Sequence, residues 1–150
     1  MTDLELQDAL IKELKKLKIQ KLENENWKDY RIFKQDEIYK EDGDLDGDYI
    51  IVIIGDEDTD EKGRWVVTIQ MSLQIVDEDP KHDGSIALAN IMNQIDLHLR
   101  KKGIIAGKYE MEPEAHKLFN DECPMEYYQA VYITKWKLPE IEMEGVEALI

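Results

Sequence analysis

The sequence of 150 residues has very little cysteine and no long apolar run. Its single cysteine, Cys123, cannot form a disulfide within the chain, which fits synthesis in a reducing compartment. No apolar run approaches the ~18 residues that a membrane-spanning helix needs. The first residues, Met1 to Asp8, lack the apolar core of a signal peptide. We therefore expect an intracellular protein without a membrane segment.

Basic residues are also scarce relative to acidic ones. The chain has 19 Lys and Arg residues and 34 Asp and Glu residues, which gives a formal net charge of −15. A chain this acidic repels phosphate backbones and anionic lipids, so we expect neither a nucleic-acid partner nor a membrane partner. Apolar residues nevertheless make up 43% of the chain, enough for a sizeable core. The composition indicates a single domain over residues 1–150 with a densely charged surface.

Catalytic motifs are missing as well. The histidines, His82, His98 and His116, show no HxxxH or HExxH spacing, and no P-loop or dinucleotide-binding glycine motif occurs. No serine or threonine has the surroundings of a nucleophile elbow. We predict that the protein is not an enzyme and has no cofactor.

Two segments have apolar residues at helical spacing. The first predicted helix runs from Thr2 to about Glu23, and Glu5 stands at capping-box spacing from Thr2. The second runs from about Ser85 to Lys102, with Gly103 as its C-cap. Their apolar stripes consist of Leu6, Leu10, Leu14 and Leu17, and of Leu88, Met92, Ile95 and Leu99.

Alternating apolar and polar residues predict strands at Arg64–Val76 and Glu126–Leu138. Tyr49–Ile54 is apolar on both faces, which is typical of a central strand. Asp29–Phe33 and Ile104–Met111 are weaker candidates for strands, and the polar stretches 55–63 and 112–124 are predicted loops. The order of elements favours an α+β fold, with a mainly antiparallel sheet of about four strands and two helices packed on one face. We expect an acidic tail from about residue 140 to be mobile.

One short motif resembles a calcium site. Asp42, Asp44 and Asp46 match the opening of an EF-hand loop, D-x-D-x-D-G. The twelfth position, which should be a bidentate Glu, is Ile53, and the loop runs into a predicted strand rather than a helix. The three aspartates are therefore weak metal candidates, and an acidic turn is the favoured interpretation.

A second acidic run, Asp56–Glu61, also contains clustered carboxylates. Two-metal hydrolases use such clusters, but they hold them on rigid strand ends, whereas this run falls in a predicted loop. A solvated charged loop is favoured, and a carboxylate-dependent hydrolase remains an alternative hypothesis.

Several residues are candidates for protein contacts. We predict that two acidic segments, Asp42–Asp48 and Asp56–Glu61, meet a basic patch, Lys12–Lys21 and Arg100–Lys102, between neighbouring copies of the chain. Asp56 and Asp58 on one side, and Lys101 and Lys102 at the end of the second helix on the other, are the candidate contact residues. Tyr127, in the aromatic cluster of the last strand, is a further candidate because aromatic residues are enriched at interfaces.

The layout of the whole chain resembles the tail terminator, or tail-completion, proteins of long-tailed bacteriophages and prophage elements. The segments that carry the resemblance follow the apolar N-terminal helix, and they are Asp48–Val52, Trp65–Ile75, Ile86–Leu99, Cys123–Tyr128 and Trp136–Ile141. In the last two, a proline followed by aromatic residues leads into the final strand, and a Trp-x-x-Pro sequence leaves it.

The resemblance implies a hexameric ring that caps the tail tube and joins it to the head connector. The implied partners are further copies of the chain, the tail-tube protein and the head connector. The implied locations are the host cytoplasm during assembly and then the virion tail. Two alternatives stay open: another neck or head–tail connector protein of the same particle, and a weak calcium-responsive binding module.

Overall fold

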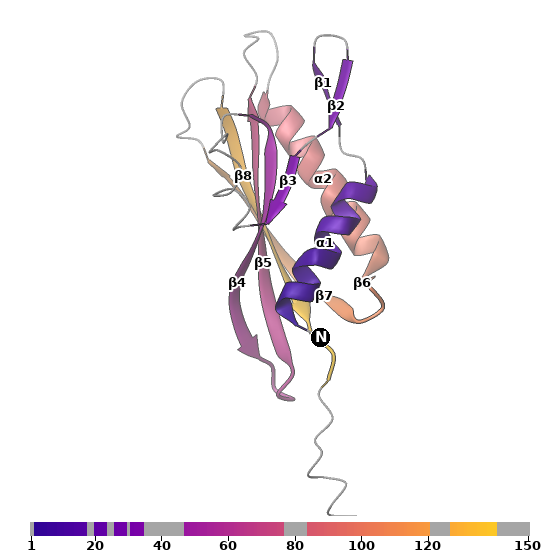
Figure 1. Ribbon diagram of the computed structural model, residues 1–150. Helices are drawn as coiled ribbons and strands as arrows, with labels where there is room; N and C mark the ends of the chain where they lie inside the picture. The colour runs from indigo at the N-terminus through magenta and orange to yellow at the C-terminus, as the bar shows by residue number, and fades with distance from the viewer. Residues whose placement is uncertain are drawn as a thin grey trace, which may run out of the picture.

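The computed structural model describes residues 2–17, 20–23, 26–29, 31–34, 47–76, 84–120 and 127–140. These residues form two helices and eight strands (Figure 1). In chain order the elements are α1 (Asp3–Leu17), β1 (Gln20–Glu23), β2 (Asn26–Asp29), β3 (Arg31–Lys34), β4 (Tyr49–Thr59), β5 (Trp65–Val76), α2 (Gly84–Lys102), β6 (Ile104–Ile105), β7 (Tyr109–Asn120) and β8 (Tyr127–Lys137).

Six of the strands form one sheet in the order β3-β4-β5-β8-β7-β6, and β1 and β2 form a separate antiparallel pair. Neighbours in the six-stranded sheet are antiparallel except β3 and β4, which run parallel. Both helices lie on the same face of this sheet (Figure 1). The predicted α+β class and the mainly antiparallel pairing are confirmed. The prediction of about four strands was too low, because short strands at both edges extend the sheet to six.

Helix α1 begins at the predicted N-cap. The backbone N–H of Glu5 donates a hydrogen bond to Thr2 Oγ1 at 3.2 Å. The helix ends at Leu17 and a strand follows, so the prediction of a helix to about Glu23 is wrong. The steps of three and four that make the apolar stripe of α1 stop at Leu17, because neither residue 20 nor residue 21 is apolar.

Helix α2 matches its predicted bounds to within one residue. Gly103 ends it with a φ of 67°, a left-handed conformation that glycine adopts without strain. The N–H of Gly103 donates to the carbonyl oxygen of Leu99 at 2.8 Å, which satisfies one of the last carbonyl groups of the helix.

The core lies between the two helices and the sheet. Alternate residues of β5, from Val67 to Ile75, and of β8, from Ala130 to Trp136, face the helices and are at most 2% exposed. The predicted alternation of both strands is therefore confirmed. The helix residues packed against them include Leu6, Leu10 and Leu14 of α1 and Leu88, Met92, Ile95 and Leu99 of α2.

Strands β4 and β7 both extend into segments predicted to be loops. β4 continues past its predicted end at Ile54, and β7 continues past Met111. Each has a β-bulge at that point, and regular pairing resumes from Glu57 in β4 and from Ala115 in β7. Residues beyond the bulges are mostly exposed, so they lack the apolar alternation on which a strand prediction depends.

The two weaker strand predictions are partly right. The segment Asp29–Phe33 divides between the end of β2 and the start of β3. The segment Ile104–Met111 contains β6 and the first residues of β7. The EF-hand-like aspartates, Asp42, Asp44 and Asp46, and the tail beyond Glu140 lie outside the described residues. In the part of the chain that is described, neither helix is long and apolar enough to cross a membrane.

Candidate functional site

The sheet face opposite the helices carries the polar and half-buried side chains of the alternating strands. Its central part contains Gln70 and Ser72 of β5 beside Val131 and Ile133 of β8. This open face, as we call it, has no helix among the described elements (Figure 1). It therefore offers a mixed polar and apolar surface on a rigid support.

A row of hydrogen-bonded side chains crosses one end of the open face. Tyr49 Oη of β4 donates to Gln74 Oε1 of β5 at 3.3 Å, and Gln129 Nε2 of β8 donates to the same oxygen at 2.8 Å. Asn120 Nδ2 of β7 donates to Gln129 Oε1 at 3.4 Å, and Gln74 Nε2 donates to the carbonyl oxygen of Gly47 at 3.0 Å. The row links four adjacent strands in one register. Gln74 is 3% exposed, so its amide depends on these partners.

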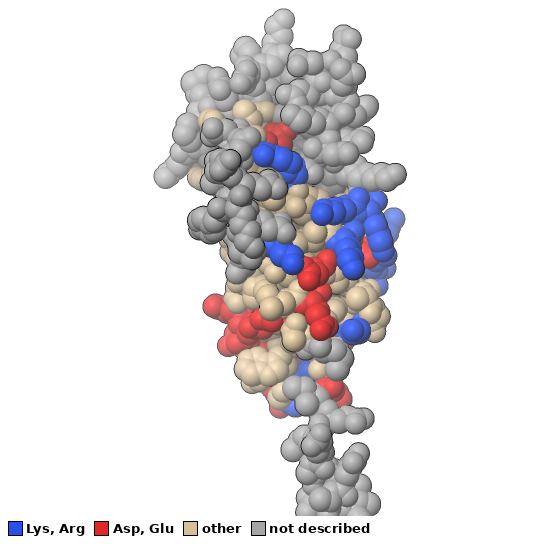
Figure 2. All heavy atoms as spheres, in the orientation of Figure 1, with Lys and Arg blue, Asp and Glu red and all other residues tan. Residues whose placement is uncertain are grey.

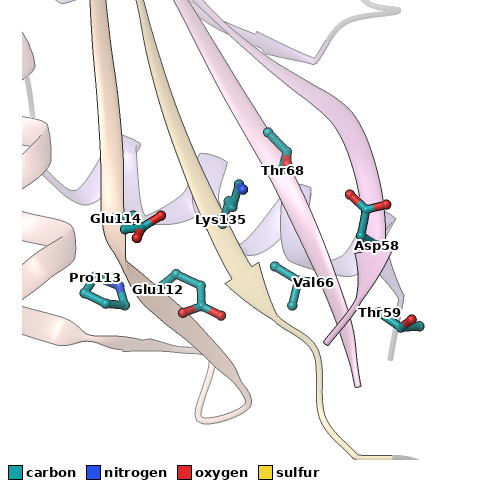
Figure 3. Close-up of a pocket in the computed structure, with 8 residues that line it drawn as sticks. All are labelled: Asp58, Thr59, Val66, Thr68, Glu112, Pro113, Glu114 and Lys135. Carbon is teal, nitrogen blue, oxygen red and sulfur yellow. The ribbon is translucent and has the colours of Figure 1, made fainter. Parts of the chain in front are cut away.

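The other end of the open face is hollowed into a groove of about 330 Å³ (Figure 3). The groove lies between the bulged parts of β4 and β7, with β5 and β8 as its floor. Its lining residues are Asp58, Thr59, Val66, Thr68, Glu112, Pro113, Glu114 and Lys135.

The groove has charged groups of both signs. Asp58 lies on the β4 wall, Glu112 and Glu114 lie on the β7 wall, and Lys135 stands between the walls (Figure 3). Glu112 also pairs with Lys137 Nζ at 3.7 Å. Neither histidine nor cysteine lines the groove, and among the described residues no group of three His, Cys, Asp or Glu side chains could hold a metal ion. The arrangement suits recognition of polar side chains on another molecule.

Two strand edges are uncovered, one at each side of the sheet. β3 pairs with β4 only from Tyr49 to Val52, so the later part of β4, Gly55–Thr59, has no outer neighbour among the described strands. β6 pairs with β7 only at Tyr109 and Glu110, so Ala115–Phe119 likewise has no described outer neighbour. An uncovered edge exposes backbone donors and acceptors that can pair with another strand.

The two edges differ in charge. The β4 edge carries three consecutive exposed acids, Asp56, Glu57 and Asp58, and red carboxylates gather on that side of the molecule in Figure 2. The β7 edge from Ala115 to Phe119 contains His116 and Lys117 and no acid.

The β7 edge also has apolar neighbours. Leu118 and Phe119 are 56% and 42% exposed, and they lie on opposite faces of the strand. Lys117 Nζ donates to Asn93 Oδ1 of α2 at 2.6 Å, which places the outer side of α2 next to this edge. Exposed apolar side chains beside an uncovered strand edge are a pattern typical of interaction surfaces.

A carboxyl pair lies beside the acidic edge. Glu57 is on the helix side of β4, and its carboxyl group interacts with that of Asp3 at the start of α1. Partial burial and the neighbouring Asp3 raise the pKa of the Glu57 carboxyl above its ordinary value. In the single subunit, two like charges therefore meet here.

A second charged cluster joins the two helices. Glu13 of α1 is buried, and its carboxylate accepts from His98 Nε2 at 3.0 Å, Lys102 Nζ at 3.1 Å and Lys16 Nζ at 3.4 Å. Burial acts to raise the pKa of Glu13, but the three hydrogen bonds outweigh it and lower this pKa to about 2. The sequence offered one signal for this cluster: Glu13 falls seven residues after Leu6 and three after Leu10, on the apolar stripe of the helix.

The residues predicted for an interface lie far apart within one subunit. Asp56 and Asp58 are on a strand at one side of the sheet, not in a loop, while Lys101 and Lys102 end the helix on the other side (Figure 1). Lys102 is engaged with Glu13 inside the subunit, and Lys101 is exposed. Tyr127 begins β8 and is half-buried on the open face. Contact between the acids and the lysines would therefore require two copies.

Comparison with known proteins adds no family to these observations, because no protein-family model matches the chain and no curated protein does so either.

Proposed function

We propose that this protein is a structural subunit that assembles with copies of itself and serves as the tail terminator of a long-tailed phage or prophage particle. In this role a ring of subunits caps the tail tube and presents a surface to the head connector. The protein would act in the host cytoplasm during assembly and afterwards in the virion tail.

The observation that carries the proposal is the pair of uncovered strand edges, β4 at Gly55–Thr59 and β7 at Ala115–Phe119. A closed ring needs two different and complementary surfaces on each subunit, because each copy contacts one neighbour on either side. Edges of unlike charge on opposite sides of one sheet meet this requirement.

The layout of the chain supports the assignment to the tail. The segments on which the resemblance depends include β5, α2 and β8, and they fold into the long central strands and the second helix of the domain. The open face and its groove leave a further surface for a partner that differs from the subunit itself.

Electron microscopy and analytical ultracentrifugation test the proposal. We expect rings of one defined size, either from the purified protein alone or after addition of the tail-tube protein of the same particle. We also expect the rings to bind at one end of the tubes and to stop their growth. Assemblies that bind elsewhere in the neck would favour another head–tail connector protein, and a protein that stays monomeric with the tube protein present would refute the proposal.

A further inference from the structure

We propose that neighbouring copies join by pairing the β7 edge of one subunit, Ala115–Phe119, with the β4 edge of the next, Gly55–Thr59, so that the sheet continues across the contact. This inference rests on the proposed self-assembly and deepens it by naming the two surfaces that meet.

The directions of the strands fit this contact. β4, β5, β8 and β7 alternate in direction, because each neighbouring pair is antiparallel. β4 and β7 of one subunit therefore run in opposite directions. A second copy in the same orientation, placed beside the first, presents its β4 antiparallel to the exposed β7, and a ladder of backbone hydrogen bonds can form.

The faces of the strands also match in one register. If Lys117 stands opposite Glu57, then His116 stands opposite Asp58. The strands are antiparallel, so one step back along β7 corresponds to one step forward along β4. Lys117 and Glu57 both lie on the helix side, since they pair with Tyr132 and Val67, whose side chains are in the core.

The second pair agrees with the first. His116 and Asp58 both lie on the open face, since their partners within the sheet are Ile133 and Val66. A single register thus brings the Lys117 ammonium group opposite the Glu57 carboxylate and the His116 imidazole opposite the Asp58 carboxylate, each pair on its own face of the sheet. Opposite charges across a strand pair stabilise it, whereas like charges destabilise it.

Contacts within the subunit leave Lys117 and Glu57 able to meet a further charged group. Lys117 donates to the neutral amide of Asn93, and its charge helps to lower the pKa of the Asp96 carboxyl, but it forms no ion pair with a carboxylate among the described residues. Glu57 has the unfavourable neighbour Asp3, whose repulsion an incoming ammonium group would relieve. Exposed apolar side chains at Leu118 and Phe119 would lose water on contact with the next copy.

A charge-swap experiment on the full chain tests the pairing. Lys117→Glu and Glu57→Lys each place like charges opposite one another, and each should weaken self-association by about tenfold, the effect expected for reversal of a cross-strand pair. The double variant should restore association, because each contact then again places a carboxylate of one copy opposite an ammonium group of the next. An equimolar mixture of the two single variants should also assemble, since alternating copies would again oppose unlike charges.

The matched control for Lys117→Glu is Lys12→Glu, which makes the same change in net charge at an exposed position of α1 and not on a strand edge. Sedimentation velocity measures association, and circular dichroism confirms that every variant is folded. If Lys117→Glu assembles as the unaltered protein does, or if the double variant is no better than the single ones, the edge pairing is wrong while ring assembly by another surface stands. If the unaltered protein stays monomeric even with the tail-tube protein present, both this inference and the proposed function fail.

Discussion

The structure allows a detailed prediction of how removal of the buried Glu13 carboxylate changes the stability of the protein. Its side chain is only 8% exposed and has three cationic or histidine partners, from both helices, within 3.4 Å. Replacing it by glutamine, which has nearly the same shape, removes the charge and leaves the packing almost unchanged. The two lysines and His98 would then face a neutral amide.

The lowered pKa sets the size and the pH range of the effect. A folded-state pKa of about 2 against an ordinary value of 4.5 corresponds to a few kcal/mol of stabilisation by the charged form. Lys16 and Lys102 are 66% and 41% exposed, so water screens part of this interaction. We therefore expect Glu13→Gln to lower the free energy of unfolding at pH 7 by about 1–3 kcal/mol.

The sign follows from the direction of the shift. Because the folded state lowers the pKa of Glu13, the stabilisation is complete above pH 4.5 and is lost as the pH falls toward 2. Urea unfolding followed by tryptophan fluorescence at several values between pH 7 and pH 2.5 should show the variant and the unaltered protein converging in acid. Glu61→Gln, at an exposed turn residue, is the matched control and should change little. An equal loss at every pH would mean that packing, not charge, is responsible, and no loss at pH 7 would refute the reasoning.

Three further substitutions and one change of solvent test other parts of the structure. Gln74→Ala should cost about 1–3 kcal/mol in urea unfolding, because it removes the oxygen that accepts from Tyr49 and Gln129 on the open face. Trp136→Ala should cost about 3–5 kcal/mol in the same assay, because Trp136 is fully buried and the change leaves a large cavity in the core. Gly103→Ala should lower the melting temperature, by an amount equivalent to about 1 kcal/mol, because an L side chain is strained at a φ of 67°. Raising the salt concentration should weaken self-association in sedimentation experiments if charged edges meet, and association that is indifferent to salt would count against that contact.

The sequence was sufficient to predict the elements that bury one face. β5 and β8 show an alternating pattern because one side of each strand lies on the helices and the other does not. The stripes of α1 and α2 were predictable for the same reason, and Gly103 marked a helix end because few other residues adopt its conformation without strain.

The strand segments that were not predicted from the sequence are held in the sheet by backbone hydrogen bonds and not by burial of one apolar face. Beyond their bulges, β4 and β7 have exposed side chains on both faces, so residues such as Asp58 and Glu114 were predicted to lie in loops. The parallel pairing of β3 with β4 depends on a chain crossing that no local pattern records.

For the candidate site, the sequence indicated some of the residues but not where they lie in the fold. Asp56 and Asp58 were singled out for their charge, but their position on an uncovered strand edge was not foreseen. His116 and Lys117 were missed as interface residues, because their segment was predicted to be a polar loop. The strand order, which places the two edges on opposite sides of the molecule, is a property of the whole fold.

That strand order also determines how the chain can fold. β8 is the last of the described strands in sequence, yet it lies between β5 and β7 and pairs with β5 along its whole length. Until β8 has been synthesised, β5 has an open edge and α2 has only part of the surface on which it packs. A nascent chain or a fragment that ends before Tyr127 would therefore expose the apolar residues of β5, and it should aggregate or bind chaperones. Completion of the sheet is thus a late event, and the β7 edge proposed for assembly forms only after it, because Ala115–Phe119 pair with β8 alone among the described strands.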